Sequence, residues 1–177
     1  MEVKMTRDKI AEAVNLAQRR HHGAITTGRS DAHGLKSVGT REHEIGAIGE
    51  AVVCEGFDID NPRLVGTYKT RPDVGRVEVR TRSRARYGRE PASLIVRNDD
   101  PDDSPFVLVR PVEGEAGWWR IVGWIWGRDA KRVEWLRGHG GREKAYFVPD
   151  SALHSPYSMM EFFNELPTVH TRKLANC

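Results

Sequence analysis

Residues 71–82 read Arg71-Pro72-Asp73-Val74-Gly75-Arg76-Val77-Glu78-Val79-Arg80-Thr81-Arg82, which predicts a turn followed by a β-strand. Pro72 and Gly75 favour the turn, and strict alternation of apolar and polar residues begins at Val77. Alternate side chains of a strand share one face of the sheet, so Glu78 and Arg80 are expected on the same face. An acid and a base two residues apart therefore project from one side of the strand.

The position of Asp73 requires a change of direction before the strand. Asp73 and Glu78 are an odd number of residues apart, so on one straight strand their carboxylates would point to opposite faces. Gly75 removes this difficulty, because glycine adopts turn and bulge conformations that other residues avoid. We therefore expect a turn at Gly75 that aims Asp73 toward Glu78.

Glu50 is the only polar side chain between Ile45 and Cys54, in a run that predicts a buried helix. Burying even a neutral polar group without a partner costs about 2–7 kcal/mol, so this carboxylate must be paired, protonated or bound to a cation. A metal ion and one of the many arginines of this chain are both compatible partners. The preceding Gly-x-x-Gly run keeps the helix surface thin enough for a strand to approach closely.

Together these features resemble the core of the PD-(D/E)XK nuclease superfamily, over about residues 41–127. Glu50 matches the helix glutamate of the family, Pro72 and Asp73 match its Pro-Asp, and Glu78-Val79-Arg80 matches its Glu-x-Lys. Arg80 is a departure, because it stands where the family has lysine. The resemblance implies a restriction-endonuclease-like α/β fold, in which a central mixed β-sheet is flanked by helices.

The resemblance also implies an activity, that of a Mg²⁺-dependent deoxyribonuclease that hydrolyses phosphodiester bonds. Asp73 and Glu78 are the expected ligands of Mg²⁺ or Mn²⁺, and Glu50 is expected to complete the shell directly or through water. Such a set suits Mg²⁺, which proteins hold with one or two carboxylates plus substrate oxygens and waters. Arginine is a poor general base, so we expect Arg80 to stabilise the charge of the transition state.

The missing lysine leaves two questions open. Lys69, in a strand predicted at residues 64–70, is a candidate substitute, although a solvated strand residue explains it equally well; Lys36 is a weaker candidate. The alternative function is a catalytically inactive nuclease-fold protein that binds nucleic acid or a protein partner.

A run of arginines follows the acidic pair and includes Arg82, Arg84 and Arg86. The net charge of the chain is only +3, with a pI of about 9.0, so the clustering of basic groups is the informative signal. Alternation would align these arginines along a DNA backbone leading away from the acids. A solvated hairpin is the alternative interpretation. DNA is the expected partner, RNA remains an alternative, and a homodimer is left open.

The length of 177 residues predicts one nuclease-like domain, 1–177. We divide it into an N-terminal helix and loop (1–40), the catalytic core (41–127), and a C-terminal strand and closing helix (128–177). Thr6 is expected to cap a helix over residues 7–20. Strands are expected at 93–97, 106–111 and 118–126, with an exposed acidic turn at 98–104. The tryptophans of 118–126 are assigned to the core rather than to base stacking.

The chain shows no sign of a membrane or secretory protein. No apolar run approaches the ~20 residues needed to span a bilayer, and Cys54 and Cys177 do not form a disulfide framework. We therefore expect a soluble cytoplasmic protein of a bacterium or a virus-infected host cell, without a membrane partner.

Overall fold

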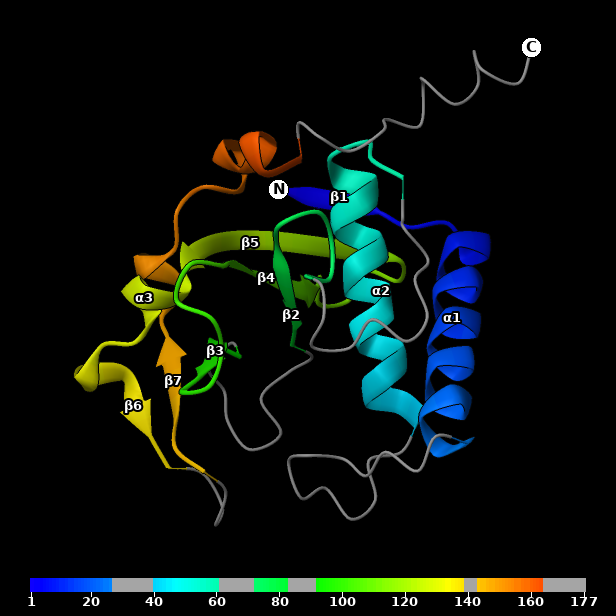
Figure 1. Cartoon of the computed structure of the whole chain (residues 1–177). Coiled ribbons are helices and arrows are strands. Elements are labelled where there is room, and N and C mark those ends of the chain that lie inside the picture. Colours follow the sequence, from blue (N-terminus) through cyan, green and yellow to red (C-terminus); the bar gives the residue numbers. More distant parts are fainter. Residues whose placement is uncertain (27–39, 61–71, 83–91, 139–142, 164–177) are drawn as a thin grey trace.

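The computed structural model describes residues 1–26, 40–60, 72–82, 92–138 and 143–163, and it shows a mixed α/β fold (Figure 1). The described strands form a four-stranded sheet and a three-stranded sheet. The order in the first is β1-β5-β4-β2, built from β1 (Glu2–Lys4), β5 (Trp118–Trp126), β4 (Pro105–Pro111) and β2 (Glu78–Thr81). The order in the second is β3-β7-β6, built from β3 (Leu94–Arg97), β7 (Ala145–Val148) and β6 (Leu136–Arg137).

The four-stranded sheet is mixed, as expected from the sequence. β2 runs parallel to β4, with Glu78 opposite Phe106, whereas β4–β5 and β1–β5 are antiparallel. β2 is the last strand in this order among the described residues, and it is the strand that carries the Glu-x-Arg motif. β1 is a short strand that sequence analysis did not anticipate. Glu78 therefore lies on the last described strand of the sheet, and Asp73 lies just before that strand.

Two hydrophobic cores lie on the two faces of this sheet, because successive residues of β4 point to opposite sides. Val107 and Val109 join the core formed with α1 (Arg7–Thr26) and α2 (Thr40–Gly56). Phe106 and Leu108 join the core formed with the three-stranded sheet. Long helices therefore cover one face, and the second sheet covers the other.

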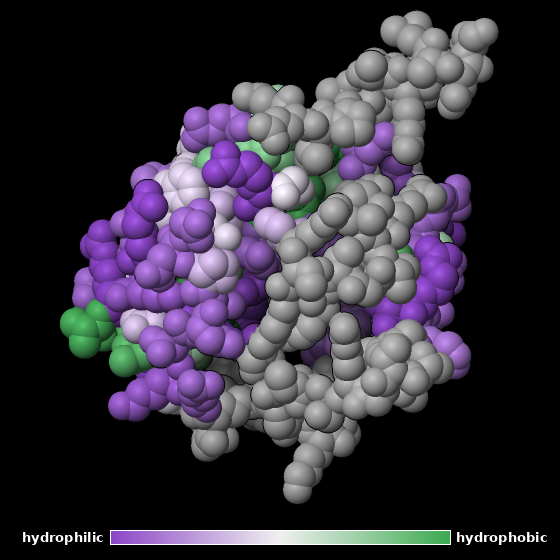
Figure 2. Space-filling model, viewed as in Figure 1, coloured by the Kyte–Doolittle hydropathy of each residue, from purple (hydrophilic) through white to green (hydrophobic). Residues whose placement is uncertain are grey.

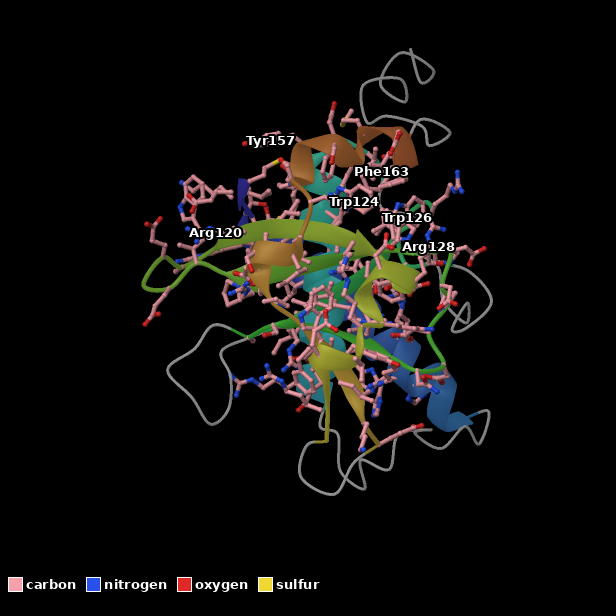
Figure 3. All side chains as sticks on the ribbon, turned by 90° about the vertical axis from the view of Figure 1, so that its left-hand side faces the viewer. Arg120, Trp124, Trp126, Arg128, Tyr157 and Phe163 are labelled. Atoms are coloured by element: carbon pink, nitrogen blue, oxygen red, sulfur yellow. The ribbon has the colours of Figure 1, made fainter. Side chains whose placement is uncertain are left out.

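The tryptophan-rich strand β5 departs from the alternation that the sequence suggests. Strict alternation would place Ile121 and Trp124 on opposite faces, yet both belong to the core on the helical side. The cause is a β-bulge, in which Val109 pairs with Ile121 and Leu108 pairs with Gly123, so Val122 is the extra residue. The predicted core role is confirmed for Trp124, which is buried, and Figure 3 shows Trp124 and Trp126 extending toward the segment that carries Phe163.

The helix predictions are confirmed with two differences in extent and type. The N–H of Lys9 donates to Oγ1 of Thr6, as an N-cap requires, but α1 continues six residues beyond the predicted end, to Thr26. The closing helix is a 3₁₀ helix, η3 (Pro156–Phe163), which buries Met159, Phe162 and Phe163. The short helix α3 (Gly127–Ala130) follows β5, and the 3₁₀ turns η1 (Val133–Trp135) and η2 (Asp150–Ala152) flank β6 and β7.

The outer surface is mainly hydrophilic in the described parts of the face that Figure 2 shows. Among the described residues, the large apolar side chains most open to solvent are Val133, Tyr157 and Met160. No helix in the described ranges is both long enough and apolar enough to cross a membrane.

Candidate active site

A tight turn at Gly75 brings Asp73 onto the edge of β2. Val74 and Val77 exchange two backbone hydrogen bonds of 3.1 and 2.8 Å, and Gly75 between them has a φ of 60°, which favours glycine. The turn folds the chain back, so that Oδ2 of Asp73 accepts a 2.8 Å hydrogen bond from the N–H of Val79. The predicted turn is therefore confirmed, and it holds Asp73 against the strand segment between Glu78 and Arg80.

The faces of β2 follow the predicted alternation around this contact. Val77 and Val79 are buried, and Val79 belongs to the core on the helical side of the sheet. Glu78 and Arg80 are half-buried, and the Arg80 guanidinium lies over the Phe106 ring at 4.9 Å, on the side of the second sheet. The acid and the base therefore share one face.

Helix α2 reaches β2 closely because of Gly49, the residue before Glu50 (Figure 1). A Cβ atom at Gly49 would lie 1.7 Å from Oγ1 of Thr81 and 2.9 Å from its Cβ, a clash that only a movement of the helix or of Thr81 would relieve. A Cβ at Gly46, in contrast, would meet nothing within 4 Å. The predicted close approach is thus confirmed for Gly49, whereas Gly46 has no such role.

Glu50 is buried, with 8% of its surface exposed, and its partner is an arginine of α1. Nη1 of Arg20 donates to Oε1 and Oε2 of Glu50, both at 2.8 Å. Of the two partners compatible with the sequence, the structure shows the arginine. Burial and the charge of Asp73 nevertheless raise the pKa of Glu50 to about 7, against the lowering effect of Arg20.

The carboxylates of Asp73 and Glu78 also occupy an unfavourable environment for negative charge. Burial raises the pKa of Asp73, opposed by the hydrogen bond from Val79 and by the charges of Arg80 and Arg20. Burial and then the charge of Asp73 raise the pKa of Glu78 to about 7, opposed by Arg80. The three carboxylates therefore repel one another within one small region, and a bound cation would relieve that repulsion.

The donor chemistry fits a hard cation, with one geometric restriction. Carboxylate oxygens are the ligands that Mg²⁺ prefers, and one or two suffice when phosphate oxygens and waters complete the shell. In the part of the chain that the structure describes, however, no three side chains of the His, Cys, Asp or Glu type stand close enough together to hold an ion as they are. Asp73 and Glu78 are therefore the fitting pair, because both oxygens of Glu50 face Arg20.

Arg80 is held by acids on two sides of its guanidinium. Nη2 lies 3.0 Å from both Oδ1 and Oδ2 of Asp100, and Nη1 lies 3.6 Å from Oε2 of Glu78. Sequence reasoning assigned Asp100 to an exposed acidic turn, and this was wrong for Asp100, whose side chain is only 13% exposed. Asp100 points inward because its carboxylate pairs with the Arg80 guanidinium.

Arg20 and Asp100 are thus the two site residues that sequence reasoning missed. A signal for Arg20 existed, since a carboxylate in an apolar helix needs a counter-ion and the preceding helix, as predicted at residues 7–20, ends in two arginines. Arg82 is half-buried at the end of β2, with its backbone N–H bonded to the carbonyl of Val109. The other residues singled out from the sequence lie outside the described residues: Lys36, Lys69, Arg84 and Arg86.

No protein-family model, no curated protein and no solved structure matches this chain. The fold and the site define a mixed α/β domain with a carboxylate-rich centre beside β2. What this centre does must therefore be argued from its own residues.

Proposed function

We propose that this chain is a metal-dependent nuclease that hydrolyses phosphodiester bonds in DNA, with Mg²⁺ or Mn²⁺ as its cofactor. The observation that carries the proposal is the Asp73–Glu78 pair, two carboxylates with raised pKa values beside a fixed arginine. The order of α2 with its buried glutamate, the Pro-Asp turn and the Glu-x-Arg strand supports the resemblance to the PD-(D/E)XK nucleases. Perturbed acids of this kind gather at functional sites.

Each residue has a role that its contacts support. Asp73 and Glu78 hold the cation, which when bound neutralises phosphate charge and lowers the pKa of a water molecule. Arg80 places a permanent positive charge on the same face as Glu78, where it contacts the phosphate as negative charge develops. Glu50 orients Arg20 beside Asp73, so its contribution comes through that arginine.

A cleavage assay tests the proposal directly. Purified protein is incubated with single-stranded, double-stranded and branched DNA, and with RNA, in Mg²⁺, in Mn²⁺ and in chelator. We expect cleavage that requires the metal and that falls by about 10²–10³-fold in Asp73→Asn and in Glu78→Gln. Glu134→Gln, at an exposed acid of η1, is the matched control and retains wild-type activity. Full activity in both site variants would refute the assignment.

A second candidate function is a nuclease-like protein that binds nucleic acid or a protein partner without cleaving it. Two observations favour it: Glu50 already has Arg20 as a counter-ion, and Arg80 already has Asp100. Such a protein would bind DNA equally well with Mg²⁺ and with chelator, and its Asp73→Asn variant would bind as the wild type does. The same purified proteins in a DNA-binding titration therefore separate the two functions.

A further inference from the structure

Arg80 is anchored more firmly than a surface arginine that only awaits a ligand. One terminal nitrogen contacts both carboxylate oxygens of Asp100 at 3.0 Å, the other faces Glu78 at 3.6 Å, and the planar group lies over the Phe106 ring. A lysine ammonium has a single nitrogen and no plane, so it cannot present one nitrogen to each acid while lying flat over the ring. A guanidinium has five N–H donors, more than these acids use, so it can also contact a phosphate.

The acid that holds Arg80 is itself fixed by the turn between β3 and β4. Oδ2 of Asp100 accepts a 2.8 Å hydrogen bond from the N–H of Arg97, which orients the carboxylate toward β2. The ammonium of Lys131 also contacts the turn, through the carbonyls of Asn98 at 3.1 Å and Asp100 at 2.6 Å and through Oδ1 of Asp102 at 2.6 Å. A lysine thus occupies the position where an acidic turn would otherwise attract a cation.

We propose that Asp100 is a positioning residue for the nuclease reaction, which aims Arg80 at the phosphate and allows arginine to serve at this position. This inference rests on the proposed function. It gives the turn 98–103, which Lys131 contacts, the role of holding Arg80 in place. It also accounts for the type of residue at position 80. An arginine presents separate nitrogens to Glu78 and Asp100 while its plane lies on Phe106, and a lysine has only one nitrogen and no planar group.

The competing explanation is a structural salt bridge that ties the turn to the sheet. Both explanations predict some loss of stability when Asp100 is changed, so stability alone does not separate them. A positioning role predicts that the loss appears in kcat more than in KM, and that it disappears once Arg80 is absent. A structural role predicts a lower free energy of unfolding in Asp100 variants, with the kcat of the folded enzyme unchanged.

Asp100→Asn is the sharpest variant, because asparagine keeps one oxygen for the N–H of Arg97, loses the charge, and puts an NH2 donor in place of the second oxygen that accepts from Arg80. We expect kcat to fall by about 10–100-fold, as for other residues that orient a functional side chain, with KM nearly unchanged. Asp103→Asn, at an exposed acid of the same turn, is the matched control and keeps wild-type kcat. If the asparagine variant does not fold, Asp100→Ser keeps an acceptor and takes its place.

A double-mutant cycle and one spectroscopic measurement complete the test. The single variant Arg80→Ala should have the same kcat as the double variant that combines Arg80→Ala with Asp100→Asn. A kcat that falls further in the double variant, by the factor that Asp100→Asn causes alone, would overturn the proposal. In nitrogen-15 spectra of the free protein, rotation of the Arg80 guanidinium should be slow in wild type and in Asp103→Asn but fast in Asp100→Asn. Equal rotation in all three also overturns it. A wild type that shows the slow rotation but cleaves no DNA in any metal would refute the proposed nuclease instead.

Discussion

Glu50 and Glu78 both have a pKa of about 7, but the two glutamates reach this value in different settings. Glu50 is more deeply buried and has a close counter-ion, with both of its oxygens 2.8 Å from Nη1 of Arg20. Glu78 is only half-buried, and its arginine, at 3.6 Å, contacts Asp100 more closely. Glu50 is therefore a satisfied acid, whereas Glu78 is under-compensated.

This difference indicates where a cation would gain most. A metal ion at Glu50 would have to displace Arg20, and the lost pair would offset part of the new attraction. A metal ion at Glu78 would meet a carboxylate that Asp73 already repels and whose arginine partner, 3.6 Å away, is shared with Asp100. Glu78 is thus the better ligand, and Glu50 the better structural anchor of the site.

The largest expected effect separates the two glutamates in the cleavage assay. Glu78→Gln removes a proposed metal ligand and should lower kcat/KM by about 10²–10³-fold, the scale of losing a main electrostatic contact to the transition state. Glu50→Gln keeps an oxygen near Arg20 and should lower kcat/KM by about tenfold. Steady-state kinetics on a DNA substrate at saturating Mg²⁺ measures both. The reverse ranking would show that Glu50, not Glu78, is the principal ligand.

The next effect tests the packing that places Glu50 beside β2. Gly49→Ala forces Thr81 or the helix to move and should destabilise the protein by about 1–3 kcal/mol. Gly46→Ala, three residues earlier in the same helix, meets open space and should stabilise it by about 0.4–1 kcal/mol. Urea unfolding of the two variants gives the comparison. A neutral result at Gly49 would mean that α2 and β2 are not in direct contact.

The sequence could predict those features of the site that depend on local chemistry. The turn at Gly75, the burial of the Glu50 helix and the shared face of Glu78 and Arg80 follow from backbone preferences and side-chain periodicity. Each of these signals comes from residues that are neighbours in the chain, so a single sequence is enough to detect them.

Long-range pairing could not be predicted in the same way. Glu50 needed a cation, but the chain offers many arginines, and only the packing of α1 on α2 selects Arg20. Asp100 belongs to a turn of four acids, where exposure is the rule, and its inward orientation depends on β2 lying next to β4. The bulge at Val122 does have a local signal, because Gly123 follows it inside the strand, but the expected alternation did not use that signal.

Stability against pH gives a smaller effect with a definite sign. Ordinary glutamates ionise near 4.5, whereas folded Glu50 and Glu78 ionise near 7, so the folded state holds more protons between these values. Stability is then lost as pH rises through this window. Glu78→Gln should flatten that decline and raise Tm by a few degrees at pH 8, with little change at pH 4.5. Glu50→Gln should flatten it too, but from a Tm that is already lower than that of the wild type at pH 4.5, because an amide offers Arg20 one acceptor oxygen in place of two.

Thermal unfolding of wild type, Glu78→Gln and Glu50→Gln between pH 4.5 and 8.5 measures these changes in Tm. Glu134→Gln, with its exposed carboxyl, is the control and should follow the wild-type curve. A Glu78→Gln variant that is less stable than wild type at pH 8 would contradict the idea that Glu78 is under-compensated.

The smallest effect is a proton count, and it identifies the ligand without any turnover. A carboxyl group must lose its proton to bind a metal, so Mg²⁺ binding at pH 6.5 should release up to about one proton from Glu78, and almost none at pH 8.5. Calorimetry in two buffers of different ionisation enthalpy measures this number. Glu50→Gln should release nearly the same number as wild type, because Arg20 keeps Glu50 out of the coordination shell, whereas Glu78→Gln should release far less. Equal proton release from Glu78→Gln and wild type would show that the titrating ligand lies elsewhere, and Asp73, whose pKa is also raised, would be the next residue to change.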